Sequence, residues 1–202
     1  MKLRYSPTSP YVRKVSVVAI EAGIADDIQQ VATNVWDPET DIASSNPLGK
    51  VPALETPDGH MLFDSPVICE YLDSLNTKTK LFPSEGPDRW HALRLQAMAD
   101  GILDAAILRL LEGKRADGER SDKWTARQIS VIDRGLDCLE AEIEEFSGSI
   151  NIGTLSIAIM LDYLDLRFSA DHWRRNRPAL ADWFETIITR PSMVATVPRE
   201  AT

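Results

Sequence analysis

The sequence predicts a small α/β domain followed by an all-helical domain. In the N-terminal part, short apolar segments alternate with two amphipathic segments, and each amphipathic segment begins at a Ser-Pro pair. Residues 76–88, NTKTKLFPSEGPD, are polar and carry two prolines, which is typical of an interdomain linker. Beyond them, apolar residues recur at helical spacing. We therefore expect a first domain at 1–77, a linker at 78–87 and a helical domain at 88–202.

The first half of the α/β domain is predicted to contain a strand, a helix and a second strand. Lys2–Tyr5 is expected to be a short strand, and a helix starts at Pro10 and ends near Gly23, which suits a helix C-terminus. The apolar residues of this helix share one face: Val12, Val15, Ala19 and Ala22. Asp27–Thr33 is a candidate second strand, and a polar loop with at most one short helix follows it.

The second half of this domain is predicted to contain two strands and a helix. Ala53–Thr56 and Met61–Phe63 are expected to be strands, because Pro57-Asp58-Gly59 makes a tight turn between them. The sheet would then have about four strands. A helix follows, with Ser65 as the N-cap and Pro66 as the first helical residue. Its buried stripe is expected to contain Val67, Ile68, Tyr71, Leu72 and Leu75.

The rest of the chain is predicted to be helical. One amphipathic helix carries apolar residues at alternating steps of three and four: Ile129, Ile132, Leu136, Leu139 and Ile143. The stretch LSIAIMLDYL, residues 155–164, is apolar nearly all round, which predicts the buried central helix of the second domain. A further helix, with Leu180, Trp183, Phe184, Ile187 and Ile188, ends near Arg190-Pro191.

Composition and charge limit the possible classes of function. Apolar residues make up 44% of the 202 residues and charged residues 26%, as in an ordinary globular protein. No apolar run approaches the ~20 residues that cross a bilayer, so we expect no membrane partner. A net charge of −9 argues against a nucleic-acid partner. Two cysteines without metal-ligand spacing, and no recognisable export signal, predict a cytoplasmic protein without structural disulfides or a metal site.

The start of the first helix is the first candidate for chemistry. In TSPYVRK, the Ser9 oxygen can cap free backbone N–H groups, and Pro10 fits the first turn of the helix. The free N–H groups and the helix dipole place about +0.5 charge there, which would stabilise a thiolate. A serine hydroxyl could donate a hydrogen bond to that thiolate, and Ser6 and Thr8 are within reach of the same place. On the alternative interpretation, the serines only shape the backbone.

Two further motifs have binding interpretations. In NPLGKVPAL, a cis bond at Val51-Pro52 would turn the chain sharply and expose the backbone groups of Val51, whereas an ordinary loop proline would not. In FDSPVICEYL, Asp64 could meet an ammonium group, and Ser65 at the helix N-terminus could help to hold a carboxylate. A plain N-cap is the alternative there. The basic residues of the N-terminal third that could meet a small anion are Arg13, Lys14 and Lys50.

These three motifs, in this order, on a four-stranded α/β domain followed by helices, resemble the glutathione S-transferase family. The resemblance covers essentially the whole chain. It implies a thioredoxin-like N-terminal domain, an all-helical C-terminal domain, and a homodimer that takes glutathione as co-substrate, one per subunit. It also implies a transferase of detoxification type, which activates the glutathione thiol for attack on a small apolar electrophile or a peroxide.

The resemblance also implies roles for particular residues. Ser9 matches the place where some classes of the family have a catalytic serine and others a cysteine. Val51 would pair its backbone with the cysteinyl part of glutathione, and Lys50 would approach the glycyl carboxylate. Asp64 and Ser65 would hold the γ-glutamyl end. Because a serine cannot form a mixed disulfide, this assignment favours conjugation, peroxide reduction or isomerisation over thiol-disulfide exchange.

Other positions are less closely matched to the family. Asp100 resembles an acidic residue that reaches the partner subunit's glutathione in some members. In GTLSIA, Ser156 stands where the family has the aspartate of a Ser/Thr-x-x-Asp helix start, and we expect this difference to affect folding more than function. The pocket for the electrophile is expected between the domains, lined by the Trp36 loop and by helix faces near Leu103, Ile107 and Leu111.

Two other hypotheses compete with a transferase. A non-catalytic binding or scaffold protein can have the same fold, because a fold does not determine function. A thiol-disulfide oxidoreductase would use Cys69 or Cys138, although Cys69 lies among apolar residues where structural burial is the simpler interpretation.

Overall fold

A computed structural model describes residues 1–76 and 80–198. Its contacts divide the chain into two compact units. Unit 1 is Met1–Pro83 together with the chain from Pro191 onward, and unit 2 is Ser84–Arg190.

The division differs from the predicted boundaries at two places. The sequence assigns residues 191–202 to the helical domain, but helix α9 (Pro191–Ala195) belongs to unit 1, because it packs against the first helix of that unit. Helix α4 begins at Gly86, inside the predicted linker, while linker residues 78 and 79 lie outside the described residues.

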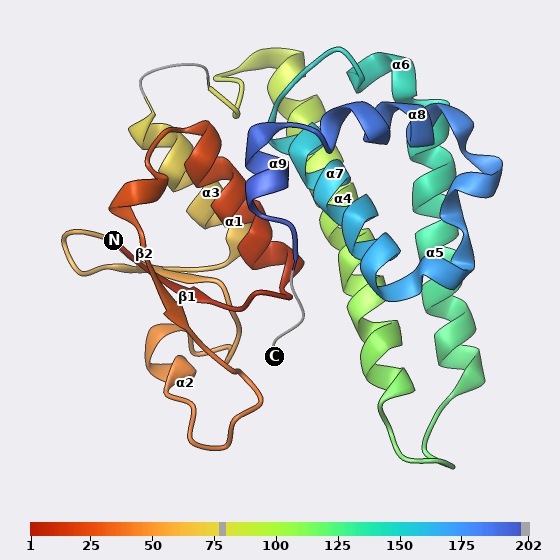
Figure 1. The fold of residues 1–202 in the computed structure, drawn as a ribbon, viewed down its shortest axis with the longest axis horizontal. Coiled ribbons are helices and arrows are strands. Elements are labelled where there is room, and N and C mark those ends of the chain that lie inside the picture. Colours follow the sequence, from red (N-terminus) through yellow and green to blue (C-terminus); the bar gives the residue numbers. More distant parts are fainter. Residues whose placement is uncertain (77–79, 199–202) are drawn as a thin grey trace. The chain divides into compact units, whose positions relative to one another are not determined.

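Unit 1 is built on a four-stranded sheet (Figure 1). Its strands are β1 (Lys2–Tyr5), β2 (Gln29–Ala32), β3 (Ala53–Glu55) and β4 (Met61–Leu62), in the order β2-β1-β3-β4. β1 runs parallel to β2 and antiparallel to β3, and β3 runs antiparallel to β4. Four strands are therefore confirmed. The second is shorter than expected, because residues 25–27 form a 3₁₀ turn before it.

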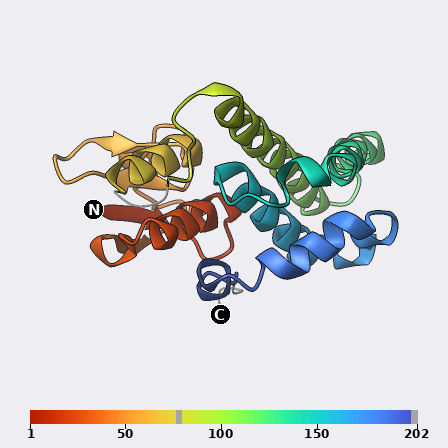
Figure 2. The same ribbon diagram turned by 90° about the horizontal axis from the view of Figure 1, so that it is seen from above.

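Two helices cover one face of this sheet. α1 (Pro10–Glu21) and α3 (Ser65–Leu75) lie side by side in Figures 1 and 2 and are in contact. The short α2 (Ile42–Ser45) lies in the loop between β2 and β3. The fully buried residues that join helices and sheet include Leu3, Leu54, Val12, Val15, Ile68 and Leu72. Removing this apolar surface from water is the main stabilising contribution to such a layer.

The helix α3 differs from its prediction in two respects. Asp64, not Ser65, is the N-cap, since the Asp64 carbonyl accepts the first helical hydrogen bond from the amide of Ile68 at 3.0 Å. Ser65 is already helical. Within the expected buried stripe, Ile68 and Leu72 are buried, but Val67 is 48% exposed and Leu75 is 43% exposed.

Unit 2 is helical, as predicted. Its helices are α4 (Gly86–Gly113), α5 (Asp122–Ala141), α6 (Ile143–Phe146), α7 (Ile152–Phe168) and α8 (Pro178–Ile187), with 3₁₀ turns at Ser169–Asp171 and Trp173–Asn176. α7 is buried over most of its length and packs against α4, which confirms it as the central helix. Within the described ranges, no helix is long and apolar enough to cross a membrane.

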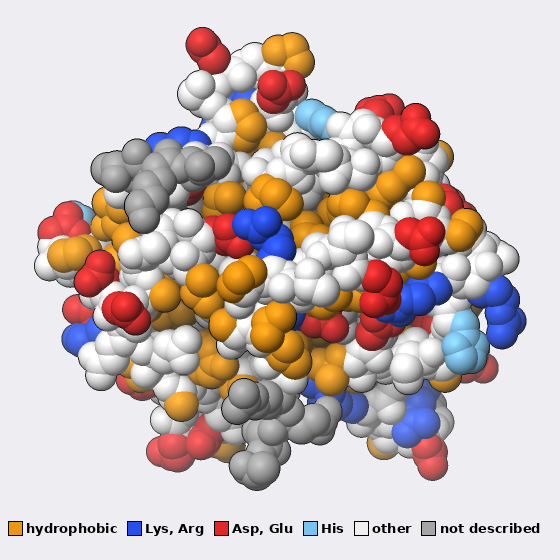
Figure 3. All heavy atoms as spheres, turned by 45° about the horizontal axis from the view of Figure 1, so that its top comes forward, with side chains coloured by type: hydrophobic (Ala, Val, Ile, Leu, Met, Phe, Trp, Pro, Cys, Tyr) orange, Lys and Arg blue, Asp and Glu red, His pale blue; other side chains and the backbone are white. Residues whose placement is uncertain are grey.

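Charged side chains do not gather in one region of the face seen in Figure 3. Acidic and basic side chains are intermixed there, with apolar groups between them. The described residues of this face therefore show no single acidic patch, although the net charge of the chain is −9.

The start of α7 is held by a reciprocal cap at a different place from the expected one. The Asn151 side chain accepts a hydrogen bond from the amide of Thr154 at 3.1 Å, and the Thr154 hydroxyl accepts one from the amide of Asn151 at 3.0 Å. Ser156 does not take part, because it lies inside the helix and its hydroxyl donates to the carbonyl of Ile152 at 2.7 Å. This pair satisfies two of the helix's free amides.

At Gly153, α7 packs closely against α4. A Cβ atom at this position would lie 2.6 Å from the carbonyl oxygen of Ala92 and 2.7 Å from Cβ of Leu95. We expect Gly153→Ala to lower the free energy of unfolding by about 1–3 kcal/mol through overpacking, measured by urea denaturation.

Gly101→Ala is the matched control for Gly153→Ala. Gly101 lies inside α4, and nothing lies within 4 Å of an added Cβ. Because alanine is the better helix former, we expect stabilisation by about 0.5–1 kcal/mol. Equal effects of the two substitutions would contradict the close approach of α7 to α4.

Candidate functional site

The pairing of β1 with β3 brings two of the predicted motifs to the same edge of the sheet. Arg4 pairs with Ala53 in an antiparallel register, so the end of β1 lies beside the beginning of β3. The loop from Ser6 to Ser9 leaves β1 at this edge, and Val51-Pro52 enters β3 at the same edge. Segments more than 40 residues apart in the sequence are therefore neighbours in the sheet.

The pairing of β3 with β4 adds the third motif to this edge. Leu54 pairs with Leu62 in an antiparallel register, so β4 ends where β3 begins. Asp64 and Ser65 follow β4 directly and start α3. The beginnings of both long helices of unit 1 and the turn before β3 thus share one edge, and each helix start presents free backbone N–H groups.

Ser9 is the N-cap of α1, as the sequence predicts. Its Oγ accepts a hydrogen bond from the amide of Val12 at 3.3 Å, and its own amide donates to the carbonyl of Ser6 at 3.3 Å. Ser9 is half-buried, as are Ser6 and Thr8. A hydroxyl that accepts a hydrogen bond keeps its own proton, so Ser9 has a proton to donate to an anion beside the helix start.

Val51-Pro52 is a cis bond, as the second motif predicts. A buried residue that the sequence analysis did not single out, Asn46, holds the loop before it. Asn46 is 1% exposed; its Nδ2 donates to the carbonyl of Lys50 at 2.8 Å, and its Oδ1 accepts from the amide of Leu48 at 3.0 Å. These bonds fix the backbone just before Val51. The Lys50 side chain itself is exposed.

The preceding loop is tied to the sheet by an ion pair. The Arg4 guanidinium on β1 donates to both carboxylate oxygens of Asp41, one of them at 3.2 Å. This hydrogen bonding lowers the pKa of Asp41 below its ordinary value. Trp36, in the same loop, is 72% exposed.

The start of α3 presents one exposed and one buried polar side chain. Asp64 is exposed and Ser65 is buried, and the Phe63–Asp64 peptide bond is also cis. An exposed carboxylate can pair with an ammonium group, and the amides of the first helical turn can hold a carboxylate. This edge of the sheet therefore offers a carboxylate for an ammonium group and backbone amides for a carboxylate. A ligand that ends in an amino-acid group carries both of these charged groups.

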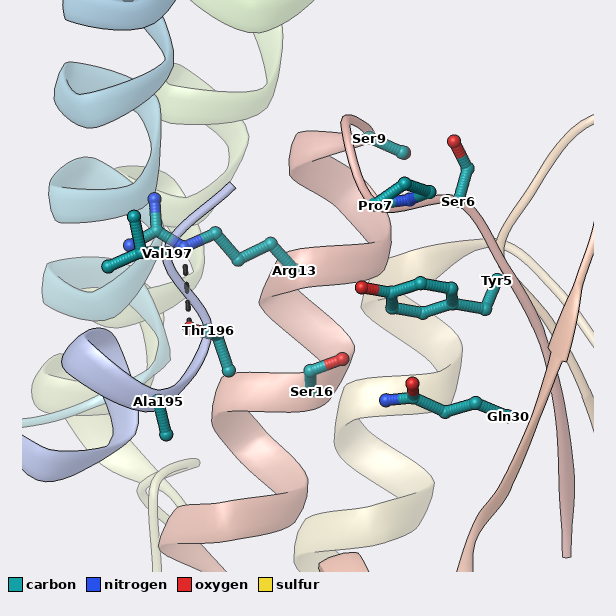
Figure 4. Close-up of a pocket in the computed structure, with 10 residues that line it drawn as sticks. All are labelled: Tyr5, Ser6, Pro7, Ser9, Arg13, Ser16, Gln30, Ala195, Thr196 and Val197. Atoms are coloured by element: carbon teal, nitrogen blue, oxygen red, sulfur yellow. Dashed lines mark hydrogen bonds between the residues drawn. The ribbon is translucent and has the colours of Figure 1, made fainter. Parts of the chain in front are cut away.

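A cavity of about 290 Å³ adjoins the beginning of α1 (Figure 4). It is lined by Tyr5, Ser6, Pro7, Ser9, Arg13, Ser16, Gln30, Ala195, Thr196 and Val197. Arg13 is 5% exposed; its Nε donates to Oγ1 of Thr196 and its Nη2 donates to the carbonyl of Met193, both at 3.3 Å. No local sequence pattern could have indicated the contact between Arg13 and Thr196, because these residues are 183 positions apart.

Two further charged residues considered from the sequence, Lys14 and Asp100, lie elsewhere. Lys14 is buried, with its Nζ 5.9 Å from the centre of the Tyr11 ring, so it does not offer an open anion site. Asp100 lies half-buried on α4 of unit 2, and its role toward a partner subunit stays a prediction.

The two cysteines are free and belong to different units. Cys69 is fully buried in α3. The Cys138 thiol donates to the carboxylate of Glu142 at 3.2 Å, and this bond raises the pKa of the thiol. Less thiolate at neutral pH means less nucleophilic sulfur, which disfavours the oxidoreductase hypothesis.

One cluster in unit 2 has the residue types of a metal site. Within the described ranges, His91, Glu142 and Glu145 have potential ligand atoms within 4.8 Å of one another. The Arg94 guanidinium donates to both carboxylate oxygens of Glu142, at 3.2 and 2.5 Å, and lowers the pKa of that carboxyl group. Because this cation already pairs with Glu142, we assign no metal ion to the cluster.

Comparisons with known proteins agree on one family. The family described as Glutathione S-transferase, N-terminal domain, matches residues 8–75. An uncharacterized GST-like protein of Escherichia coli K12, YibF, is 35% identical over 205 residues, covering the whole of both chains. The chain belongs to the glutathione S-transferase family. This membership, with the four-stranded sheet and the helical unit, confirms the thioredoxin-like fold and the helical region expected from the sequence.

Solved structures of this family resemble the chain over nearly its whole length. A glutathione transferase family member from Pseudomonas fluorescens Pf-5, with bound glutathione, is 40% identical, with 98% of each chain covered and a TM-score of 0.94. A glutathione S-transferase from Methylobacillus flagellatus, also with glutathione bound, is 37% identical, covers 98% of this chain and 99% of its own, and has a TM-score of 0.93.

The loop before the cis bond gives a test of how this edge is held together. Because Asn46 is buried and makes two hydrogen bonds, Asn46→Ala should lower the free energy of unfolding by about 1–3 kcal/mol in urea denaturation. Asn34→Ala is the control: Asn34 makes a similar turn, accepting from the amide of Trp36, but it is exposed. We expect its effect to stay within about 0.5 kcal/mol, and equal losses in both variants would contradict a special role for Asn46.

Proposed function

We propose that the protein binds glutathione and activates its thiol for attack on a small electrophile. One observation carries this proposal. The register of β1, β3 and β4 brings the N-cap Ser9, the cis bond before Pro52 and the start of α3 to a single edge of the sheet. Membership of the glutathione S-transferase family supports the same conclusion.

Ser9 is the proposed catalytic residue. A free thiol with a pKa of about 8.5 is only a few per cent ionised at neutral pH, so the site must favour the thiolate. The positive end of α1 and the Ser9 hydroxyl proton both favour a negative sulfur beside them. Ser9 then acts as a hydrogen-bond donor and not as a nucleophile.

The remaining site residues are proposed to bind the peptide. The backbone of Val51, oriented by the Asn46 hydrogen bonds, pairs with the cysteinyl residue, and Lys50 approaches the glycyl carboxylate. Asp64 meets the γ-glutamyl ammonium group, and Ser65 with the amides of the first turn of α3 holds the γ-glutamyl carboxylate.

In the proposed conjugation, the glutathione sulfur forms a bond to an electrophilic carbon. The leaving group departs with the electron pair of the bond that breaks, and the thiol proton passes to solvent. Glutathione is a co-substrate, and this step needs no metal ion. The sequence predicts a small apolar electrophile or a peroxide as acceptor, from Leu103, Ile107 and Leu111; Leu103 is buried, and the other two are half-buried on α4.

Bound ligands in related structures support this proposal. The Pseudomonas fluorescens and Methylobacillus flagellatus proteins contain glutathione. A second structure of a Pseudomonas fluorescens Pf-5 family member, 41% identical, contains S-(propanoic acid)-glutathione, a ligand whose sulfur carries a carbon substituent. We propose the same ligand class for this chain.

We also propose that the protein is a cytoplasmic homodimer that acts in detoxification. The unexpected exposure of Val67 and Leu75 on α3 supports an association between copies, because a second copy that covered these apolar side chains would remove them from water. The measurement that checks this is the molar mass in solution.

Substitution of Ser9 tests the catalytic assignment. Ser9→Ala removes both the cap and the hydroxyl, Ser9→Gly removes the hydroxyl but weakens the helix start by only about a few tenths of a kcal/mol, and Ser9→Thr keeps both. Without the hydroxyl, the pKa of the bound thiol should rise by about one to two units, so glutathione-dependent turnover of a model aryl halide at pH 6.5 should fall about 10- to 100-fold in the Ala and Gly variants. The Thr variant should stay within a few-fold of the wild type.

Two further results decide between the hypotheses. Unchanged turnover in Ser9→Gly would remove Ser9 from the mechanism and direct attention to Ser6 or Thr8. Calorimetry with glutathione separates a transferase from a scaffold protein of the same fold: we expect binding at or below millimolar concentration, and no heat of binding at that concentration would favour the scaffold.

A further inference from the structure

The cavity beside α1 has a lining unlike the apolar pocket expected from the sequence. It lies wholly within unit 1, between the loop after β1, the outer side of α1, the edge strand β2 and the segment after α9. Seven of its ten lining residues have hydrogen-bonding side chains: Tyr5, Ser6, Ser9, Arg13, Ser16, Gln30 and Thr196. Hence the group that fills it must satisfy polar partners.

The polar groups approach one another across the cavity. Figure 4 shows the Tyr5 hydroxyl directed at α1 between Arg13 and Ser16, and the Gln30 amide directed into the same space from β2. The Ser16 hydroxyl donates to the carbonyl of Val12 at 3.2 Å, so toward the cavity it has only lone pairs to offer. Two donors directed at a ligand at this place are the Tyr5 hydroxyl and the Gln30 amide (Figure 4).

The charge of the lining favours an acid over a base. The chain has 31 acidic residues against 22 Lys and Arg, yet none of the described residues that line this cavity is Asp or Glu. Its one formally charged lining residue is Arg13, which is held in place by Thr196 and Met193. A carboxylate would here meet neutral donors and a cation, whereas an ammonium group would meet no compensating acid from the lining.

The cavity also reaches the proposed reaction centre, because Ser9 and Ser6 are part of the same lining. A substituent on a sulfur held at Ser9 can therefore extend along α1 toward Tyr5 and Gln30. Successive side chains of a strand point to opposite faces, so Gln30 lines the cavity while its neighbour Gln29 does not.

We propose that this cavity binds the carboxylate of the acceptor, so that the preferred electrophiles are small carboxylic acids. The inference rests on the proposed function, and it replaces the apolar acceptor class expected from the sequence. Tyr5 and Gln30 determine this specificity by donating hydrogen bonds to the carboxylate. Arg13 is a positioning residue, because its hydrogen bonds hold Thr196 and Met193 at the side of the cavity.

Binding of two glutathione conjugates with the same length of carbon chain tests the proposal without turnover. S-(2-carboxyethyl)glutathione carries a carboxylate where S-propylglutathione carries a methyl group. By calorimetry at pH 7, we expect the carboxylate ligand to bind roughly tenfold more tightly, since hydrogen bonds to a charged group are among the stronger ones. Equal affinities, or tighter binding of S-propylglutathione, would overturn the proposal.

Matched variants assign the effect to the cavity. Gln30→Leu and Tyr5→Phe each remove one donor and should reduce the preference for the carboxylate several-fold, while leaving the affinity for S-propylglutathione nearly unchanged. Gln29→Leu is the control on the same strand and should keep the full preference. If both cavity variants still prefer the carboxylate conjugate as strongly as the wild type does, Tyr5 and Gln30 are not the carboxylate-binding residues, and the proposed site is wrong.

Glutathione itself distinguishes this proposal from the one on which it depends. If glutathione binds but the two conjugates do not differ, only the carboxylate site is wrong. If neither glutathione nor either conjugate binds, the proposed function fails, and the carboxylate site fails with it.

Discussion

The antiparallel pairing of β3 with β1 is the constraint on which the candidate site depends. β3 is only three residues long, yet its register with Arg4 and Leu3 decides which loops become neighbours. A shift of one residue would turn Leu54 away from the core, so burial of Leu3 and Leu54 fixes the register. The hydrophobic core of unit 1 thereby determines the position of a polar site that contributes little to that core.

Local signals predicted the parts of the site that local chemistry decides. Ser9-Pro10 gave the start of α1 correctly, because a capping oxygen and a first-turn proline act within four residues. The same reasoning placed the cap of α3 one residue late, since Asp64 and Ser65 are both good capping residues and the sequence does not decide between them. Periodicity found the apolar stripe of α3, but it could not tell that Val67 and Leu75 lie outside the core.

Tertiary contacts decide the parts that were missed. Asn46 looks like any loop asparagine until the fold buries it, and the role of Arg13 depends on a partner at Thr196. The cap of α7 shows the same limit at short range, because Asn151 and Thr154 form it in place of the Ser/Thr-x-x-Asp pair that the family pattern suggests. The fold class and the order of the motifs were therefore predictable, whereas the character of the cavity was not.

The return of α9 to unit 1 has a consequence for how the protein is made. The ribosome releases the sheet and α1 first, then the whole of unit 2, and only afterwards the residues around Thr196 that wall the cavity. A nascent chain can thus bury Leu3 and Leu54 early, but it carries an unfinished cavity until translation has passed α9. The proposed recognition of a carboxylate on that side of α1 therefore requires the segment that is synthesised after unit 2.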